Sequence, residues 1–143
     1  MWILAALLFA DSASADNNFK VPLTRTESLE VATAGAGDPI VLIPGLFGSE
    51  FEFRKLVPLL NQAGYRTIVI EPLGIGTSAR PEHADYSLTA QADRVAAALD
   101  RLGVGDAIVV AHSVGAAIAS RRTSGRSAAR CAASWAPSAA GPA

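Results

Sequence analysis

Short apolar runs separated by glycine-rich turns mark the middle of the chain. Residues 40–43, 65–70 and 107–111 are largely apolar over four to six positions. Runs of this length predict strands that are buried on both faces of a parallel sheet. The segment 24–33 predicts one or two outer strands.

Amphipathic segments lie between these runs. Ser49 and Glu52 form a capping-box pair, which predicts a helix beginning near Glu50. Pro58 is expected to kink this helix, and Gly64 to end it. The apolar face of the predicted helix consists of Phe53, Leu56, Val57 and Leu60.

A second predicted helix, over residues 88–102, begins after Ser87 as its cap. Its buried stripe consists of Leu88, Ala92, Val95, Leu99 and Leu102. Residues 114–119 begin a third helix. Because strands and helices alternate, the expected fold class is α/β, with a mostly parallel, doubly wound sheet and right-handed crossovers.

The N-terminus differs in character from the middle of the chain. Residues 2–10 are almost wholly apolar, and Ala13 and Ala15 give the small-x-small pattern of a signal-peptidase site. The pattern predicts a signal peptide over residues 1–15 and export to the periplasm or beyond. The alternative is a buried first strand or helix in a protein that stays uncleaved in the cytoplasm. The apolar run is too short for a stable membrane span.

The last segment, residues 120–143, contains no Val, Ile, Leu, Phe or Met. Eight Ala, five Ser and four Arg dominate it, so it can bury little apolar surface. The composition predicts a low-complexity, disordered tail, or the product of a reading-frame slip in a GC-rich gene. The folded domain is therefore expected over residues 16–119.

Composition excludes several function classes. The 143 residues carry 12 Lys and Arg against 13 Asp and Glu, a formal net charge of −1, which argues against a nucleic-acid partner. Two histidines and one cysteine allow neither a Cys/His metal cluster nor an internal disulfide. We expect no metal and no cofactor.

The strongest chemical signal is Ala111-His112-Ser113-Val114-Gly115, which lies between an apolar strand and a helix start. This is the position of a nucleophile elbow, G-x-S-x-G, with alanine at the first small position. The turn is sharp, so small residues are needed on both sides of the nucleophile. The predicted elbow lifts the Ser113 hydroxyl above the carboxyl end of the sheet.

Two backbone amides are candidates for an oxyanion hole beside this serine. The N–H of Val114 begins the helix that follows the elbow. The second donor is expected in the turn after residues 40–43, from Leu46 or alternatively Phe47. Gly45 allows a substrate carbonyl to approach this turn closely.

These motifs resemble the α/β-hydrolase superfamily over residues 29–119. The resemblance rests on IVLIPGLFGS, YRTIVIEPLGIGTSARP and AIVVAHSVG, in that order and spacing. It implies a sheet of the α/β-hydrolase type, truncated here after the elbow helix. Pro44 stands where the family usually has histidine, and Glu71 where it usually has an aspartate that shapes the turn.

The resemblance also implies an acyl-enzyme mechanism in which Ser113 attacks a carbonyl, a histidine accepts its proton and an acid orients that histidine. In the family the acid and then the histidine follow the serine in the chain. No Asp, Glu or His follows Ser113 in these 143 residues. His83 is a poor substitute, His112 is expected to be a packing residue, and Asp106 precedes its strand at the wrong end of the sheet.

The leading hypothesis is the N-terminal part of an exported serine hydrolase that acts on small carboxylic esters or related acyl compounds. Serine at the elbow argues against dehalogenase or epoxide-hydrolase chemistry. The chain alone is expected to have little activity, and the edge of the strand at 107–111 to be exposed. The alternatives are a catalytically silent fragment or binding module, and a site completed by a second polypeptide. Phe47, Phe51 and Phe53 are expected in the helix core in preference to an acyl pocket.

Overall fold

A computed structural model describes residues 17–121 and 130–134 of the chain. The expected signal peptide at 1–15 and most of the expected tail lie outside the described residues. The division of the chain into these three parts therefore stays a prediction.

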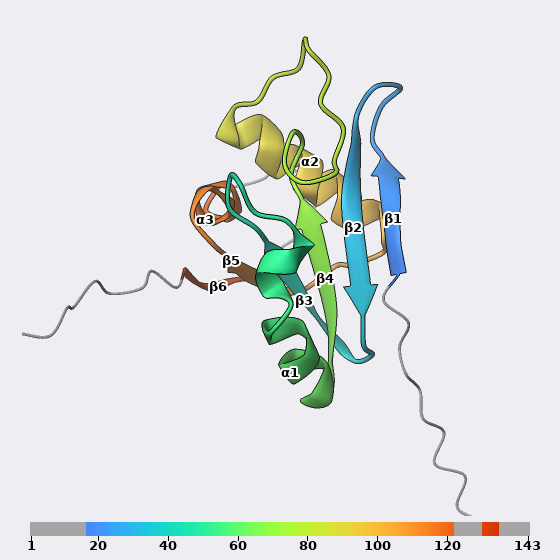
Figure 1. Cartoon of the computed structure of the whole chain (residues 1–143), viewed down its shortest axis with the longest axis vertical. Coiled ribbons are helices and arrows are strands. Elements are labelled where there is room, and N and C mark those ends of the chain that lie inside the picture. Colours follow the sequence, from blue (N-terminus) through green and yellow to red (C-terminus); the bar gives the residue numbers. More distant parts are fainter. Residues whose placement is uncertain (1–16, 122–129, 135–143) are drawn as a thin grey trace, which may run out of the picture.

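The described residues form one six-stranded sheet in the order β1-β2-β4-β3-β5-β6 (Figure 1). The antiparallel part consists of β1 and β2 with β4, and the remaining neighbours are parallel. The bounds are β1 Asn17–Pro22, β2 Ser28–Ala34, β3 Asp38–Ile43, β4 Tyr65–Glu71, β5 Ile108–Ala111 and β6 Arg130–Ser134. The mostly parallel α/β sheet is confirmed. The outer segment predicted at 24–33 contains most of β2, whereas β1 lies before it and was not predicted.

Helices cover both faces of this sheet, which confirms the doubly wound arrangement. The bounds are η1 Glu50–Phe53, a 3-10 helix, then α1 Leu56–Gln62, α2 Leu88–Arg101 and α3 Val114–Ala119. Figure 1 shows α1 on one face, with α2 and α3 on the other. Ile40, Leu42 and Val69 pack toward α1, whereas Val41, Ile43 and Ile68 join the larger cluster under α2 and α3. Alternate residues of each parallel strand thus supply the two cores.

The segment after β3 is not the single helix that the sequence predicts. It forms the short η1 and then α1, with a break at Arg54 and Lys55. Pro58 does not interrupt α1, because it occupies the first turn, where a backbone N–H has no intrahelical partner to lose. Gly64, at φ 87°, ends the segment as predicted.

The predicted helix over 88–102 is confirmed as α2. The Ser87 hydroxyl accepts a hydrogen bond from the Ala90 N–H at 3.2 Å. The predicted stripe faces the sheet, with Ala92, Val95 and Leu99 buried.

The sheet does not end at β5. Residues 130–134 form β6 and pair with β5 in parallel, so the expected exposed edge of β5 and the expected lack of structure are wrong for these five residues. Parallel pairing uses main-chain N–H and C=O groups, and it therefore does not require large apolar side chains. Composition was for this reason a poor guide to β6.

In the part of the chain that the structure describes, no helix has the length and apolar character needed to cross a membrane.

The β1–β2 hairpin is joined to α2 by a paired charge. Arg94 donates from Nη2 to Glu27 Oε1 at 2.6 Å and from Nε to Glu27 Oε2 at 3.1 Å. The two side chains are only 12% and 15% exposed. The hydrogen bond from Arg94 lowers the pKa of Glu27 below its ordinary value. This two-point contact attaches the outer, antiparallel part of the sheet to the helical layer.

We expect Arg94→Met to lower the free energy of unfolding by about 1.5–3 kcal/mol, because it leaves a largely buried carboxylate without its partner. A carboxylate with a lowered pKa stabilises the fold at neutral pH, and that stabilisation is lost as the pH falls through the lowered value. Urea unfolding should therefore show a smaller difference between the two proteins in acid than at neutral pH. Asp100→Asn, at an exposed position of the same helix, is the matched control. Equal stability of Arg94→Met and the unaltered chain at neutral pH would contradict the claim that the Arg94–Glu27 pair stabilises the fold.

Candidate active site

Ser113 lies at the sharp junction between β5 and α3. Its backbone has φ 54° and ψ −122°, and among the described residues it alone has a positive φ without being glycine. A side chain in this region of backbone space costs roughly 1–3 kcal/mol, so the surrounding contacts must hold it there. The residue is exposed, in keeping with an accessible hydroxyl.

Hydrogen bonds on both sides hold this junction. The His112 N–H donates to the carbonyl of Ile43, at the end of β3, at 3.1 Å. The N–H of Gly115 donates to the His112 carbonyl at 2.9 Å, and the N–H of Ala116 to the Ser113 carbonyl at 3.0 Å. The elbow is thus attached to β3 just before Ser113, and it is closed by its own hydrogen bonds just after Ser113.

Gly115 allows α3 to approach the end of β3. A Cβ at this position would lie 2.5 Å from the carbonyl oxygen of Ile43 and 2.6 Å from that of Pro44. Real Cβ atoms do not approach backbone oxygens so closely, so only a hydrogen fits there. Ala111, the small residue on the other side, is buried at the end of β5.

The turn after β3 lies directly against this junction. The Gly48 N–H donates to the Gly45 carbonyl at 3.0 Å, which places Leu46 and Phe47 at the corners of a β-turn. A Cβ on Gly45 would lie 3.3 Å from the Cβ of Ser113. The structure therefore brings together the two segments that the sequence predicts to form the site.

The two candidate donor amides belong to these two segments. Within residues 17–121 and 130–134, neither the Leu46 N–H nor the Val114 N–H donates a hydrogen bond to another residue. Their role as an oxyanion hole belongs to the proposal below.

Glu52 joins the turn to the elbow, a contact that the sequence does not predict. Its Oε2 accepts from the Gly45 N–H at 3.1 Å, and its Oε1 lies 2.6 Å from Nδ1 of His112. The predicted capping box is therefore only half formed: Ser49 Oγ accepts from the Phe51 N–H at 3.3 Å, but Glu52 does not return to Ser49. Spacing alone cannot reveal a contact between side chains so far apart in the chain.

His112 is not the packing residue that the sequence predicts. Its side chain is 48% exposed and is held by the Glu52 carboxylate. The reversal of direction at the elbow turns this imidazole toward the turn after β3, away from the core.

Glu71, at the end of β4, is almost fully buried, and its carboxylate accepts three hydrogen bonds. The donors are the Glu50 N–H at 2.9 Å, the Thr77 N–H at 2.6 Å and the Thr77 hydroxyl at 3.3 Å. These bonds fix the turn after β4 and the start of η1 relative to each other.

Neither His83 nor Asp106 is joined to Ser113 by a hydrogen bond or ion pair in the described ranges. His83 is exposed in the loop before α2, and it lines a shallow hollow with Thr26 and Arg80. Asp106 precedes β5, and it therefore lies at the opposite end of that strand from Ser113.

The expected aromatic core holds for one of three residues. Phe53 is buried, whereas Phe51 is 64% exposed and Phe47 is 99% exposed. The shortness of η1 explains the exposure of Phe51, since a single 3-10 turn presents only one side to the sheet, whereas Phe47 lies outside η1, at the corner of the turn after β3. Phe51 instead lies under the Arg54 guanidinium, 4.0 Å from ring centre to Cζ.

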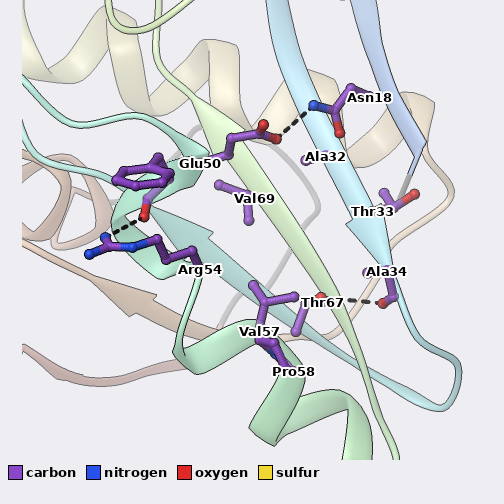
Figure 2. A pocket seen from close by; sticks show the side chains of 11 residues that line it. Asn18, Ala32, Thr33, Ala34, Glu50, Arg54, Val57, Pro58, Thr67 and Val69 are labelled. Atoms are coloured by element: carbon purple, nitrogen blue, oxygen red, sulfur yellow. Dashed lines mark hydrogen bonds between the residues drawn. The ribbon is translucent and has the colours of Figure 1, made fainter. Parts of the chain in front are cut away.

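A cavity of about 320 Å³ lies on the α1 face of the sheet, between η1, α1 and strands β1, β2 and β4 (Figure 2). Asn18 donates to the Glu50 carboxylate at 2.8 Å on one side of it, and the Thr67 hydroxyl donates to the Ala34 carbonyl at 3.3 Å on another. Ser113 does not line this cavity, which is therefore separate from the candidate active site.

Among the described residues, no group of three or more His, Cys, Asp or Glu side chains is placed to hold a metal ion.

We expect Gly115→Ala to lower the free energy of unfolding by roughly 1–3 kcal/mol, because the new methyl group meets two carbonyl oxygens. An alanine in place of a glycine that has open space around it and a negative φ would instead keep or slightly raise the stability. Gly105→Ala is the control, since a Cβ there meets no atom within 4 Å and the residue has no positive φ. Urea unfolding measures the free energy of unfolding of both variants. A Gly115→Ala protein as stable as the unaltered chain would rule out the close approach of α3 and β3.

Comparison with known proteins yields hydrolases. Bifunctional epoxide hydrolase 2 of Sus scrofa is 33% identical over 61% of this chain and 16% of its own length. Lipase 1 of Psychrobacter immobilis is 37% identical over 58% of this chain and 26% of its own. Among solved structures, epoxide hydrolase VrEH1 from Vigna radiata superposes with a TM-score of 0.68 at 26% identity, over 73% of this chain and 32% of its own.

The chain thus spans between 16% and 32% of the length of these three proteins. The sequence profile of the alpha/beta hydrolase fold matches residues 38–124, which include the turn after β3, the elbow and α3. The chain therefore belongs to the α/β-hydrolase family.

Proposed function

We propose that this chain is the nucleophile-bearing part of a serine hydrolase that acts on small carboxylic esters or related acyl compounds. The observation that carries the proposal is the strained backbone of the exposed residue Ser113, which lies against Gly45 of the turn after β3. The similarity to lipases and epoxide hydrolases supports a hydrolase in general. The choice of Ser113 as nucleophile rests on its geometry.

In the proposed reaction, the Ser113 oxygen attacks the substrate carbonyl carbon while a base accepts the hydroxyl proton. The carbonyl oxygen gains negative charge and accepts hydrogen bonds from the Leu46 and Val114 amides. The tetrahedral intermediate expels the alcohol, which takes the proton from the base. Water then cleaves the acyl-serine ester in the same way and releases the carboxylic acid.

The elbow side chain decides between the two reaction types found among the relatives. A carboxylate that opens an epoxide forms an ester, which water can cleave at its carbonyl. A serine oxygen that opens an epoxide would form an ether, which contains no carbonyl for water to attack. Turnover at Ser113 therefore requires an acyl substrate.

The proposal requires a proton acceptor for Ser113. The chain has two histidines, and His112 directs its Nδ1 to Glu52 while His83 lies exposed in the loop before α2. We therefore assign the base and its orienting acid to polypeptide outside these 143 residues, either in a longer form of the chain or in a second subunit. Export through a signal peptide at residues 1–15 is part of the same proposal.

The second candidate is a binding module that performs no hydrolysis. The observation in its favour is that, in the described part of the chain, neither histidine side chain is hydrogen-bonded to the Ser113 hydroxyl. Such a module would still offer the Leu46 and Val114 amides to an oxygen of a ligand.

An alkyl fluorophosphonate distinguishes the two, with imidazole added as an external base. We expect Ser113 to be labelled at least about 100-fold faster than the exposed Ser120, because the proposed oxyanion donors would stabilise the transition state at Ser113. Mass spectrometry of peptides locates the adduct. The labelling rate should rise with imidazole concentration, and Ser113→Ala should remove the fast phase. Equal labelling of Ser113 and Ser120 would instead support the binding module.

A further inference from the structure

We propose that Glu52 is a positioning residue whose carboxylate joins the turn after β3 to the nucleophile elbow. The claim that this contact affects the reaction at Ser113 rests on the proposed function. The link itself is a separate geometrical claim, and it can be tested without any reaction.

The carboxylate uses one oxygen for each side of the site. Oε2 accepts from the Gly45 N–H at 3.1 Å, and Oε1 lies 2.6 Å from His112 Nδ1. Gly45 immediately precedes Leu46, which carries one proposed oxyanion donor. His112 immediately precedes Ser113, so each contact is a single residue away from a group that would act on the substrate.

The element that carries Glu52 is itself held firmly. Ser49 caps η1, the Glu50 N–H donates to the buried Glu71 carboxylate at 2.9 Å, and the Phe53 ring is buried beside Glu52. The base of the Glu52 side chain is therefore fixed relative to the sheet. Its carboxylate can transfer that rigidity to the exposed turn and to the elbow.

The chemistry of both partners selects a carboxylate. The Gly45 N–H is a donor, and Nδ1 of His112 must carry a proton to bind an anionic oxygen, so both groups need an acceptor. A glutamine offers one acceptor oxygen, and its amide nitrogen can only donate. It could therefore keep one of the two contacts and would lose the other.

The exposure of the pair limits what it contributes to stability. The side chains of Glu52 and His112 are 26% and 48% exposed, so solvent screens their attraction. A carboxylate also disfavours negative charge on a nearby oxyanion, so the charge of Glu52 does not itself favour the reaction. The effect that we infer is therefore on the relative position of the Leu46 amide and Ser113.

The test compares Glu52→Met, which removes both acceptors, with Glu52→Gln, which keeps one. The matched control is Glu50→Met on the same 3-10 helix, since the Glu50 carboxylate turns away to Asn18 (Figure 2). The full 143-residue chain is used throughout. The first measurement is the fluorophosphonate labelling rate of Ser113 with added imidazole, and the second is NMR of the Gly45 amide and the His112 imidazole.

We expect Glu52→Met to slow the labelling of Ser113 by about 10- to 100-fold. A small displacement of the turn that carries the Leu46 amide would strongly reduce the stabilisation of the transition state. Glu52→Gln should lie between this variant and the unaltered chain, and Glu50→Met should remain within about twofold of the latter. The Gly45 amide proton should move upfield in Glu52→Met, and the His112 ring nitrogens should shift with it. A merely structural role would lower the thermal midpoint without this ordered series.

A second variant, His112→Leu, has no side-chain donor, so it cuts the contact to the elbow and leaves the bond to Gly45. It should slow labelling while the Gly45 amide signal stays in place, and it should add little to the effect of Glu52→Met in the double variant. If Glu52→Met does not fold, this variant tests the link between the turn and the elbow in its place.

Unchanged labelling and unchanged Gly45 and His112 resonances in Glu52→Met would overturn the inference, as would fully additive effects of the two variants. If Ser113 of the unaltered chain does not label faster than Ser120, the proposed function fails. The resonances then decide by themselves whether Glu52 joins the turn to the elbow.

Discussion

The close approach of α3 to the end of β3 is the contact on which the rest of the site depends. Gly115 lies against the carbonyl oxygens of Ile43 and Pro44, where no side chain fits. The His112 N–H is bonded to the same Ile43 carbonyl. Between these two points the chain must reverse within a few residues, and Ser113 takes up the strain with a positive φ. An exposed serine at the carboxyl end of the sheet is the direct result.

This approach also decides what surrounds the serine. Because β3 and β5 are parallel neighbours, the turn that leaves β3 and the elbow that leaves β5 emerge at the same edge of the sheet. Gly45 then meets the Cβ of Ser113, and Glu52 reaches both segments. The Arg94–Glu27 pair stabilises a different region, the antiparallel hairpin against α2. Stability at the periphery and geometry at the site thus come from separate contacts.

Membership in the α/β-hydrolase family supports a hydrolase in general, and the proposal of acyl chemistry rests on the serine at the elbow. The relatives include both epoxide hydrolases and lipases, and the chain spans less than a third of the length of each of the three compared. A serine oxygen forms an intermediate that water can cleave only when the substrate is an acyl compound. In this proposal the nucleophile and the oxyanion donors lie within the chain, and the proton acceptor belongs to polypeptide outside it.

The sequence by itself determined the strands β3, β4 and β5, the capped helix α2 and the small-residue spacing around Ser113, because these patterns are local and repeat with the period of each element. Tertiary structure alone decided the pairing of β6, the split between η1 and α1, and the turning of Glu52 and His112 toward each other. A capping pattern indicates only that a carboxylate can accept a hydrogen bond from a donor nearby in the chain. Which donor it finds depends on segments brought together across the sheet, and their distance is set by packing, not by spacing along the chain.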